Sequence, residues 1–271
     1  MNEISNMLSY HFMQRALIVG VLVSVCAALL GVSLVLKRYS MIGDGLSHVG
    51  FGALAIASAF GLTPLYVAVP VVIIAAVILL ALQQSSKVKG DAAIAIISSA
   101  SLAIGVITVS VTTGMNTEVS SYMFGSILSL SRSDTILSVI LSITVLVLFI
   151  LFYPRIFAIT FDETFTKATG TNTKIYNMLL AVLTAVTVVL GMRMMGALLI
   201  SSLIIFPALS AMRICKSFKS VIFCAAGIGV VCFLIGVCAS YFLEMPTGAS
   251  IVAVNLVAFG AFSLTGKIIK K

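Results

Sequence analysis

Residues 16–36 run ALIVGVLVSVCAALLGVSLVL, a stretch of 21 residues that contains no charged side chain. A helix needs about 20 apolar residues to cross the hydrocarbon core of a bilayer, so this stretch is long enough to span it. The run ends at Lys37 and Arg38 without the A-x-A site at which a signal peptide is cleaved. We therefore expect a retained first span, and the run over 65–82 predicts another of the same kind.

Composition extends this interpretation to the whole chain. Of the 271 residues, 61% are hydrophobic and only 9% are charged, whereas soluble domains carry roughly 25% charged residues. Outer-membrane barrels are built from alternating segments of about ten residues, which differ from these long continuous runs. The sequence therefore predicts an all-α, polytopic transmembrane helical bundle that forms one domain over 1–271. Nine candidate spans cover 16–36, 41–61, 64–82, 92–113, 136–153, 175–192, 195–213, 220–243 and 248–265, or eight if one segment is re-entrant.

The net charge of +8 does not indicate a nucleic-acid partner, because the basic residues are scattered singly among short loops. Lys and Arg in such loops are retained on the cytoplasmic side of a membrane. Arg155, Lys167 and Lys174 accordingly place the longest loop, residues 154–174, in the cytoplasm. Arg193 falls on the opposite side of this map and disagrees with it. The five cysteines form no C-x-x-C pair and are expected to be packing residues.

An acid and an imidazole fall at helical spacing at one place in the chain, where Asp44 precedes His48 by four residues. One helical turn puts both on one face, where a carboxylate oxygen and an imidazole nitrogen can hold a divalent cation. Ionisable groups inside a membrane are costly, and their presence there indicates a function. The alternative is that Asp44 is simply solvated at the headgroups beside Lys37 and Arg38.

Several small residues surround this pair, among them Gly43, Gly45, Gly50 and Gly52. They would leave room for an ion, and they are also typical of membrane helices that pack closely together. Close packing is the preferred interpretation. A bent or broken helix over 43–52 is the alternative, because several glycines weaken a helix. Two ligands make an incomplete structural site, which suits transport because the ion must also be released.

A second segment, Phe161-Asp-Glu-Thr-Phe-Thr-Lys-Ala-Thr-Gly170, lies inside the longest loop. It predicts a short amphipathic helix with Asp162 and Glu163 at its start and Gly170 as its stop. Phe161 and Phe165 would then share one face of that helix. Exposed aromatic residues on a helix favour a docking site for a cytoplasmic partner over a surface that is merely solvated.

Two further segments carry isolated polar or helix-breaking residues. Residues 193–211 hold Pro207 and the hydroxyls of Ser201 and Ser202 within an apolar run. Pro207 frees a backbone carbonyl, which is tolerated where neighbours or a cavity satisfy it. Glu244 precedes a turn between the last two spans, and a lone acid at a membrane edge is more often solvated than a ligand.

Taken in order, these segments resemble the membrane permease subunit of the divalent-metal ABC importers, a family that carries zinc, manganese or iron. The similarity extends over nearly the whole chain. It rests on four motifs: a basic pair with Gly-Asp-x-Leu-Ser-His at 37–48, Phe-Asp-x-x-Phe with a closing Gly at 161–170, Gly-Ala-Leu-Leu-x-Ser with Pro-Ala at 196–208, and acid-x-Pro-small-Gly at 244–248.

The resemblance implies an ABC importer permease fold and a multi-pass subunit of the prokaryotic cytoplasmic membrane, embedded in lipid. It implies three protein partners: cytoplasmic ABC ATPase subunits, an extracytoplasmic metal-binding protein, and a second permease copy that completes a homodimer. It implies that this chain is not an enzyme and holds no permanent cofactor, only the transported zinc, manganese or iron.

The resemblance also carries residue roles. By this resemblance Asp44 and His48 would line the metal path, and Glu244 would have a weaker link to it. Glu244 departs from the family's commoner Asp, and Ser240 stands one turn earlier where a His would complete a second acid–His pair. The role of coupling to the ATPase falls on residues 154–174, chiefly on Phe161, Asp162, Glu163, Phe165 and Gly170.

Other classes of protein stay open at this point. An ion-driven secondary metal carrier needs no ATPase, and an ABC permease for a chelated metal or a vitamin needs no bare acid–His pair. An intramembrane enzyme would need a nucleophile–base pair or an HExxH helix, and neither surrounds His11 or His48. The chain lacks the Gly-x-x-x-x-Gly-Lys-Ser/Thr phosphate loop, so an ATPase would have to be a separate subunit. Carboxylate and imidazole suit several metals, so the sequence does not select one.

Overall fold

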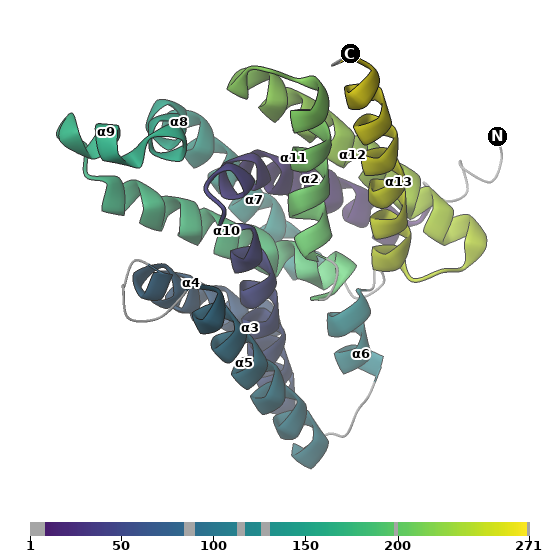
Figure 1. The fold of residues 1–271 in the computed structure, drawn as a ribbon. Coiled ribbons are helices and arrows are strands. Elements are labelled where there is room, and N and C mark those ends of the chain that lie inside the picture. Colours follow the sequence, from purple (N-terminus) through teal and green to yellow (C-terminus); the bar gives the residue numbers. More distant parts are fainter. Residues whose placement is uncertain (1–8, 84–89, 113–116, 126–130, 198–199, 270–271) are drawn as a thin grey trace.

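A computed structural model describes residues 9–83, 90–112, 117–125, 131–197 and 200–269 of the chain. Within these ranges all regular structure is helical and no strand is present, which confirms the all-α class (Figure 1). The centre of the third motif, residues 198–199, lies outside the described residues. The described helices are α2 (His11–Leu36), α3 (Ser40–Ala59), α4 (Pro64–Gln83), α5 (Gly90–Thr112), α6 (Thr117–Phe124), α7 (Arg132–Leu151), α8 (Tyr153–Phe161), α9 (Glu163–Ala168), α10 (Thr173–Met195), α11 (Ile200–Ile214), α12 (Phe218–Leu243) and α13 (Thr247–Ile269).

Seven of these described helices, namely α2, α4, α5, α7, α10, α12 and α13, are long and apolar enough to cross a membrane. The expected count of eight or nine spans is therefore too high, although the polytopic class is correct. The two expected spans that drop out, 41–61 and 195–213, correspond to α3 and α11. Helix α11 has 15 residues and reaches only about 22 Å, less than the hydrocarbon thickness of about 30 Å. Helix α3 carries Asp44, His48 and four glycines, which dilute its apolar character.

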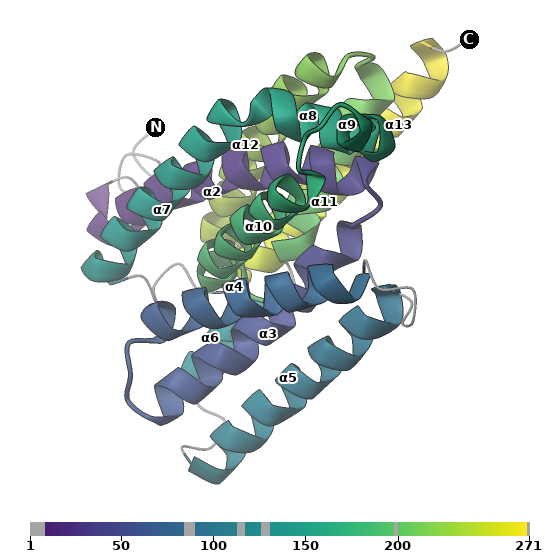
Figure 2. The same cartoon turned by 90° about the vertical axis from the view of Figure 1, so that its left-hand side faces the viewer.

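The helices form two packed groups. Helices α3, α4 and α5 run side by side along one side of the molecule in Figure 2, and α3 packs against both of its neighbours. Helices α2, α7, α10, α11, α12 and α13 make up the larger group, in which most of α2 and α10 is buried. Helix α10 joins the groups by packing on both α2 and α4. The short helices α8 and α9 lie at the end of the molecule where α2 finishes and α10 begins (Figures 1 and 2).

A tight turn joins α2 to α3 and fixes where the acid–imidazole segment starts. The amide of Arg38 donates to the carbonyl of Val35 at 3.1 Å, and the amide of Tyr39 donates to that of Leu34 at 2.8 Å. This is the hydrogen-bond pattern of a Schellman helix end. Arg38 occupies the left-handed position of this motif with φ of 60°, where glycine is the usual residue. A side chain that accepts this conformation indicates a turn held firmly by its surroundings.

The basic residue that disagreed with the charge map has an ion pair inside the protein. Arg193 is buried near the end of α10, and its Nη2 lies 2.6 Å from Oδ2 of Asp134 in the first turn of α7. The guanidinium also lies 5.5 Å from the ring centre of Tyr122 in α6. An arginine neutralised in this way is part of the packing and carries little information on which side of the membrane it lies.

Glycines bring α3 unusually close to its neighbour. A Cβ atom added to Gly52 would lie 2.6 Å from the backbone oxygen of Ser101 in α5, so only a residue without a side chain fits there. Helix α3 nevertheless runs without a break from Ser40 to Ala59. The preferred interpretation of the glycines as packing residues is confirmed at this position, and the alternative of a broken helix is wrong. Packing on both sides supports the helix where propensity alone would not.

The close approach of α3 and α5 gives a stability prediction. We expect Gly52→Ala to destabilise the protein by about 1–3 kcal/mol, because the new methyl group must push the α5 backbone away. The matched control is Gly227→Ala in α12, where an added Cβ meets no atom within 4 Å and should stabilise the helix by about 0.5–1 kcal/mol. Thermal unfolding of the purified proteins in detergent measures both changes. Equal midpoints for the two variants would contradict the packing argument.

Candidate functional site

Asp44 and His48 lie one turn apart on α3, at the only two positions between residues 42 and 55 that are not buried. The Asp44 side chain is 37% exposed and that of His48 is 15% exposed. All other side chains in this part of α3 pack against neighbouring helices. The predicted pairing on one helix face is therefore present. Asp44 and His48 form a partly exposed polar surface within the buried stretch 42–55 of α3, and we call this surface the window.

The separation of the two groups suits a cation between them. Nε2 of His48 lies 3.8 Å from Oδ2 of Asp44, which is too long for a hydrogen bond. Bonds of about 2.1 Å from a metal to each donor allow the donors to lie up to about 4.2 Å apart, so the gap can hold an ion. Nδ1 of His48 is buried and has no hydrogen-bond partner in the described part of the chain. Nε2 is the nitrogen that faces the carboxylate.

Helix α11 adds a hydroxyl to the pair. Oγ of Ser201, in the first turn of α11, donates to Oδ1 of Asp44 at 3.2 Å, while Oγ of Ser47 donates to the Asp44 backbone carbonyl at 2.7 Å. The two oxygens of the Asp44 carboxylate thus have different surroundings, with Oδ1 held by Ser201 and Oδ2 directed at His48. Ser201 was noted in the sequence only as a hydroxyl in an apolar run, because nothing there shows that α11 crosses α3 at this point.

Glu244 lies elsewhere in the fold. It is exposed at the end of α12 in the left-handed conformation, with φ of 52°, and shares a cavity of about 340 Å³ with Phe12 and Met13 at the start of α2. Asp44 follows the opposite end of α2, a helix of 26 residues that is about 39 Å long. Among the described residues, no group of three or more His, Cys, Asp or Glu side chains comes together. In the described part of the chain Asp44 and His48 therefore meet as a pair, and Glu244 does not join them.

The segment with the aromatic residues forms two helices instead of the single predicted one. Asp162 is extended, with φ of −146°, because it caps α9 by accepting a hydrogen bond from the amide of Phe165 at 2.8 Å. Phe161 ends α8 and Phe165 belongs to α9, so they do not share the face of one continuous helix, and that prediction is wrong. Both rings are nevertheless open to the surroundings, with 60% of Phe161 and 66% of Phe165 exposed.

The predicted stop of this segment is confirmed. Gly170 follows α9 with φ of 82°, and the amide of Thr171 donates to the carbonyl of Thr166 at 3.3 Å. This is again the Schellman pattern, here with the glycine that it favours.

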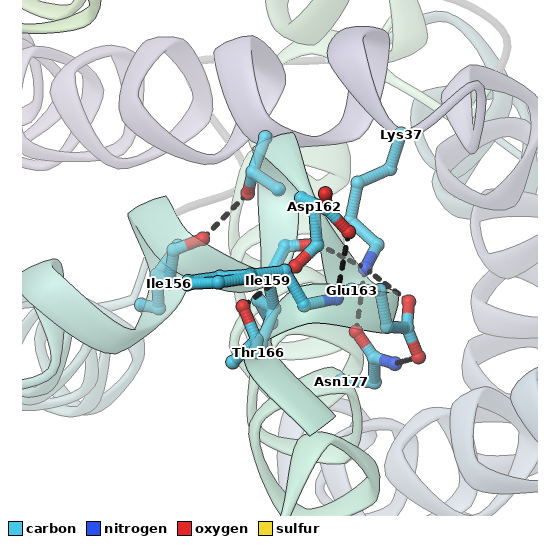
Figure 3. A network of polar contacts seen from close by, with 9 residues as sticks. Lys37, Ile156, Ile159, Asp162, Glu163, Thr166 and Asn177 are labelled. Atoms are coloured by element: carbon cyan, nitrogen blue, oxygen red, sulfur yellow. Dashed lines mark hydrogen bonds and ion pairs between the residues drawn. The ribbon is translucent and has the colours of Figure 1, made fainter. Parts of the chain in front are cut away.

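Glu163, in the first turn of α9, points back into the protein. Its Oε2 lies 2.9 Å from Nζ of Lys37, and its Oε1 accepts a hydrogen bond from Nδ2 of Asn177 at 2.7 Å (Figure 3). Burial raises the pKa of the Tyr39 hydroxyl, and the negative charge of Glu163 raises this pKa further. Lys37 was noted in the sequence only as part of the basic pair that ends the first apolar run, and Asn177 was not singled out. A lone amide within an apolar run was the available signal for Asn177.

Comparison with known proteins identifies the chain. A family model for the ABC 3 transport family matches residues 9–265. The chain belongs to the ABC 3 transport family. This membership confirms the resemblance inferred from the four motifs and agrees with a multi-pass protein of the plasma membrane, as the apolar helices also indicate.

Relatives whose names state a transport role align with almost the whole chain. Manganese transport system membrane protein MntC of Listeria monocytogenes is 30% identical and covers 94% of this chain and 91% of its own length. Manganese import system permease protein ScaB of Streptococcus gordonii is 29% identical, with coverage of 92% and 90%. A Haemophilus influenzae protein described as an iron transport system membrane protein is 34% identical, with coverage of 93% and 89%.

A solved structure shares the fold of this ABC 3 family chain. PsaBC from Streptococcus pneumoniae in complex with Fab superimposes with a TM-score of 0.86 at 30% identity, covering 96% of this chain and 93% of the matched chain. A second solved structure, of a transporter assigned to the metal-chelate ABC type in an inward-facing conformation, gives a TM-score of 0.74 at 17% identity and covers 97% and 89%. The second likeness concerns the fold alone.

The left-handed glycine after α9 gives a prediction for the local structure. We expect Gly170→Ala to destabilise the turn by about 1 kcal/mol, because the added Cβ meets open space but disfavours the positive φ. Gly170→Asn should cost less, since asparagine tolerates this conformation. Hydrogen exchange of the α9 amides in the two variants measures the difference. Equal exchange in both variants would show that the backbone conformation is not the cause.

Proposed function

We propose that this chain is the permease subunit of an ATP-driven importer that passes a divalent transition metal across the cytoplasmic membrane. The observation that carries this proposal is the window on α3, where the two incompletely buried side chains are an acid and an imidazole at metal-bridging distance. Burying every neighbour of this pair while leaving the pair accessible suits a surface that an ion passes. The proposed metal site consists of Asp44 and His48.

Manganese is the first candidate for the transported metal, with ferrous iron second. The donors at the site are a carboxylate, an imidazole and the Ser201 hydroxyl, and no thiolate belongs to them. Oxygen-rich donor sets with imidazole suit manganese and iron, whereas thiolates would favour softer ions. Relatives named for manganese and for iron transport support this order. Zinc, the third candidate from the family resemblance, serves as a competitor in the experiment below.

A second copy of the chain would complete the site. Two His or Asp ligands hold an ion only weakly, and a second Asp44–His48 pair would raise the number to four. A homodimer with the two windows facing one another would form such a site at the interface between subunits, as closed two-fold symmetry permits. A site divided between two moving halves can also open and release its ion.

Separate subunits would supply energy and metal. Cytoplasmic ABC ATPase subunits would bind α8 and α9 through residues 154–174, and an extracytoplasmic binding protein would deliver the ion. ATP-driven closure of the ATPases would rock the two permease halves, giving alternating access. The exposed rings of Phe161 and Phe165 support this docking role, since large aromatic residues are preferred anchors at protein interfaces.

The site assignment predicts a transport defect. We expect Asp44→Asn and His48→Gln each to reduce uptake of radioactive manganese about tenfold or more at limiting metal, because each change removes a ligand or its charge. Uptake is measured in cells that lack their own importer and produce this permease with its ATPase and binding protein. Competition with unlabelled iron and zinc ranks the metals.

Glu244→Gln is the matched control, since it neutralises an acid that lies apart from α3. It should import manganese at the rate of the unaltered protein. Normal uptake by the Asp44→Asn, His48→Gln double variant at limiting metal would remove the assignment. Uptake that persists with a hydrolysis-deficient ATPase would favour the alternative of an ion-driven secondary carrier. Uptake only of chelated metal or of a vitamin would favour the other alternative.

The docking role predicts a loss of assembly. We expect Phe165→Ala to weaken binding of the ATPase by about 2 kcal/mol or more, because truncating an aromatic anchor at an interface has this effect. Phe223→Ala is the control, since Phe223 is also an exposed ring but lies on α12, a helix apolar enough to face lipid. Co-purification of the ATPase at several concentrations measures both. Equal recovery of the ATPase with the two variants would argue against docking through α9.

A further inference from the structure

Lys37 is a buried cation that uses all of its hydrogen-bonding capacity on three separate helices. It follows α2, and only 5% of its side chain is exposed. Its Nζ donates to the backbone carbonyl of Ile159 in α8 at 3.0 Å, to Oε2 of Glu163 in α9 at 2.9 Å and to Oδ1 of Asn177 in α10 at 2.7 Å. An ammonium group has three donors, so each of them has an acceptor.

The acceptors are themselves joined into a closed network. Asn177 accepts from Lys37 through its oxygen and donates to Oε1 of Glu163 through its nitrogen at 2.7 Å. Figure 3 shows Lys37, Glu163 and Asn177 converging below the end of α2, with Ile159 beside them. Lys37 is buried while the Glu163 side chain is 42% exposed, so removing Glu163 would leave the buried ammonium group without its counter-charge. The coupling segment is thus fastened at this point to the turn that begins α3.

This turn is the short route from the coupling segment to the metal pair. Helices α8 and α9 pack on α10 and α8 also packs on α2, while α3 packs mainly on α4 and α5 and also on α10 and α11. The turn is stiffened by its Schellman hydrogen bonds and by the ring of Tyr39, whose centre lies 5.6 Å from Nζ of Lys37. Asp44 then lies about 6 Å along the axis of α3 from Ser40.

We propose that Lys37 is the positioning residue that transmits movement of α8 and α9 to α3, and so couples ATP hydrolysis to the Asp44–His48 pair. When the ATPase displaces α9, Glu163 moves with it, Lys37 follows its ion-pair partner, and the stiff turn shifts the first two turns of α3. This inference rests on the proposed import function and names the link within it. Lys37 does not touch the ion, and it acts through the helix that carries the ligands.

The test separates coupling from folding and from assembly. The complete importer is reconstituted in liposomes with its ATPase and binding protein, and manganese uptake and ATP hydrolysis are measured in the same sample. Lys37→Met replaces the charged side chain with an uncharged one of similar length. We expect this variant to raise the ATP hydrolysed per manganese ion imported about tenfold, an effect of the size with which one site usually influences another. ATPase binding should stay normal, because the exposed rings of Phe161 in α8 and Phe165 in α9 are unchanged.

Four further variants give the test its controls. Lys219→Met removes an exposed lysine at the start of α12 and should leave the ratio unchanged. Glu163→Gln keeps the shape of its side chain but not the charge, and it should raise the ratio even if Lys37→Met fails to fold. The exchange Lys37→Glu with Glu163→Lys restores an ion pair and should bring the ratio back toward normal relative to Lys37→Glu alone.

The outcomes are distinct. A normal ratio in Lys37→Met or in Glu163→Gln would overturn the inference while leaving the proposed import function intact. An exchange variant no better than Lys37→Glu alone would also overturn it, since the inference requires an ion pair between positions 37 and 163. Absence of manganese import by the unaltered importer would overturn the proposed function, and the inference with it.

Discussion

The interior of a bilayer supplies no hydrogen bonds, and this constraint decides where the polar side chains of the described helices find their partners. Most hydroxyls bond to the carbonyl one turn earlier in their own helix, as Ser24 does to Gly20 and Thr184 to Leu180, both at 2.7 Å. Such residues need no partner on another helix. Other polar side chains reach across helices, and each of these marks a place where two elements are held in a defined relation. A few buried hydroxyls, Ser33 and Ser142 among them, have no hydrogen-bond partner in the described part of the chain.

Three such cross-helix contacts organise the described part of the fold. Asp134 and Arg193 join α7 to α10, Lys37 joins the end of α2 to α8, α9 and α10, and Ser201 joins α11 to Asp44. Asp44 differs from Asp134 and Glu163, which pair with cations, because one of its oxygens is directed at an imidazole 3.8 Å away. A membrane protein bears the cost of such an incomplete pair where an ion completes it from time to time. The proposed metal site is a place where an acid and an imidazole face one another without a closing hydrogen bond.

The sequence predicted much of this, and its failures have physical causes. The all-α class, the i, i+4 placement of Asp44 and His48 and the end of α9 at Gly170 all depend on local spacing, which a sequence displays directly. The break at Asp162 was missed because capping competes with helix continuation, and here the cap won. The number of spans was overestimated because two expected spans are not membrane-crossing helices. Helix α3 is diluted by polar residues and glycines, and α11 has only 15 residues. Lys37 and Asn177 are 140 residues apart, so only the folded chain shows that they meet.

The pairing of Arg193 with Asp134 has a consequence for how the protein enters the membrane. Arg193 lies in the last turn of α10, where a guanidinium without a partner still adds to the free energy of inserting that helix into a bilayer. Asp134 precedes Arg193 by 59 residues, and the ribosome therefore delivers the carboxylate first. Asp134 in α7 can then supply the negative charge that pairs with Arg193 when α10 is inserted. The acid that neutralises Arg193 is thus synthesised, with α7, before α10 and its arginine reach the membrane.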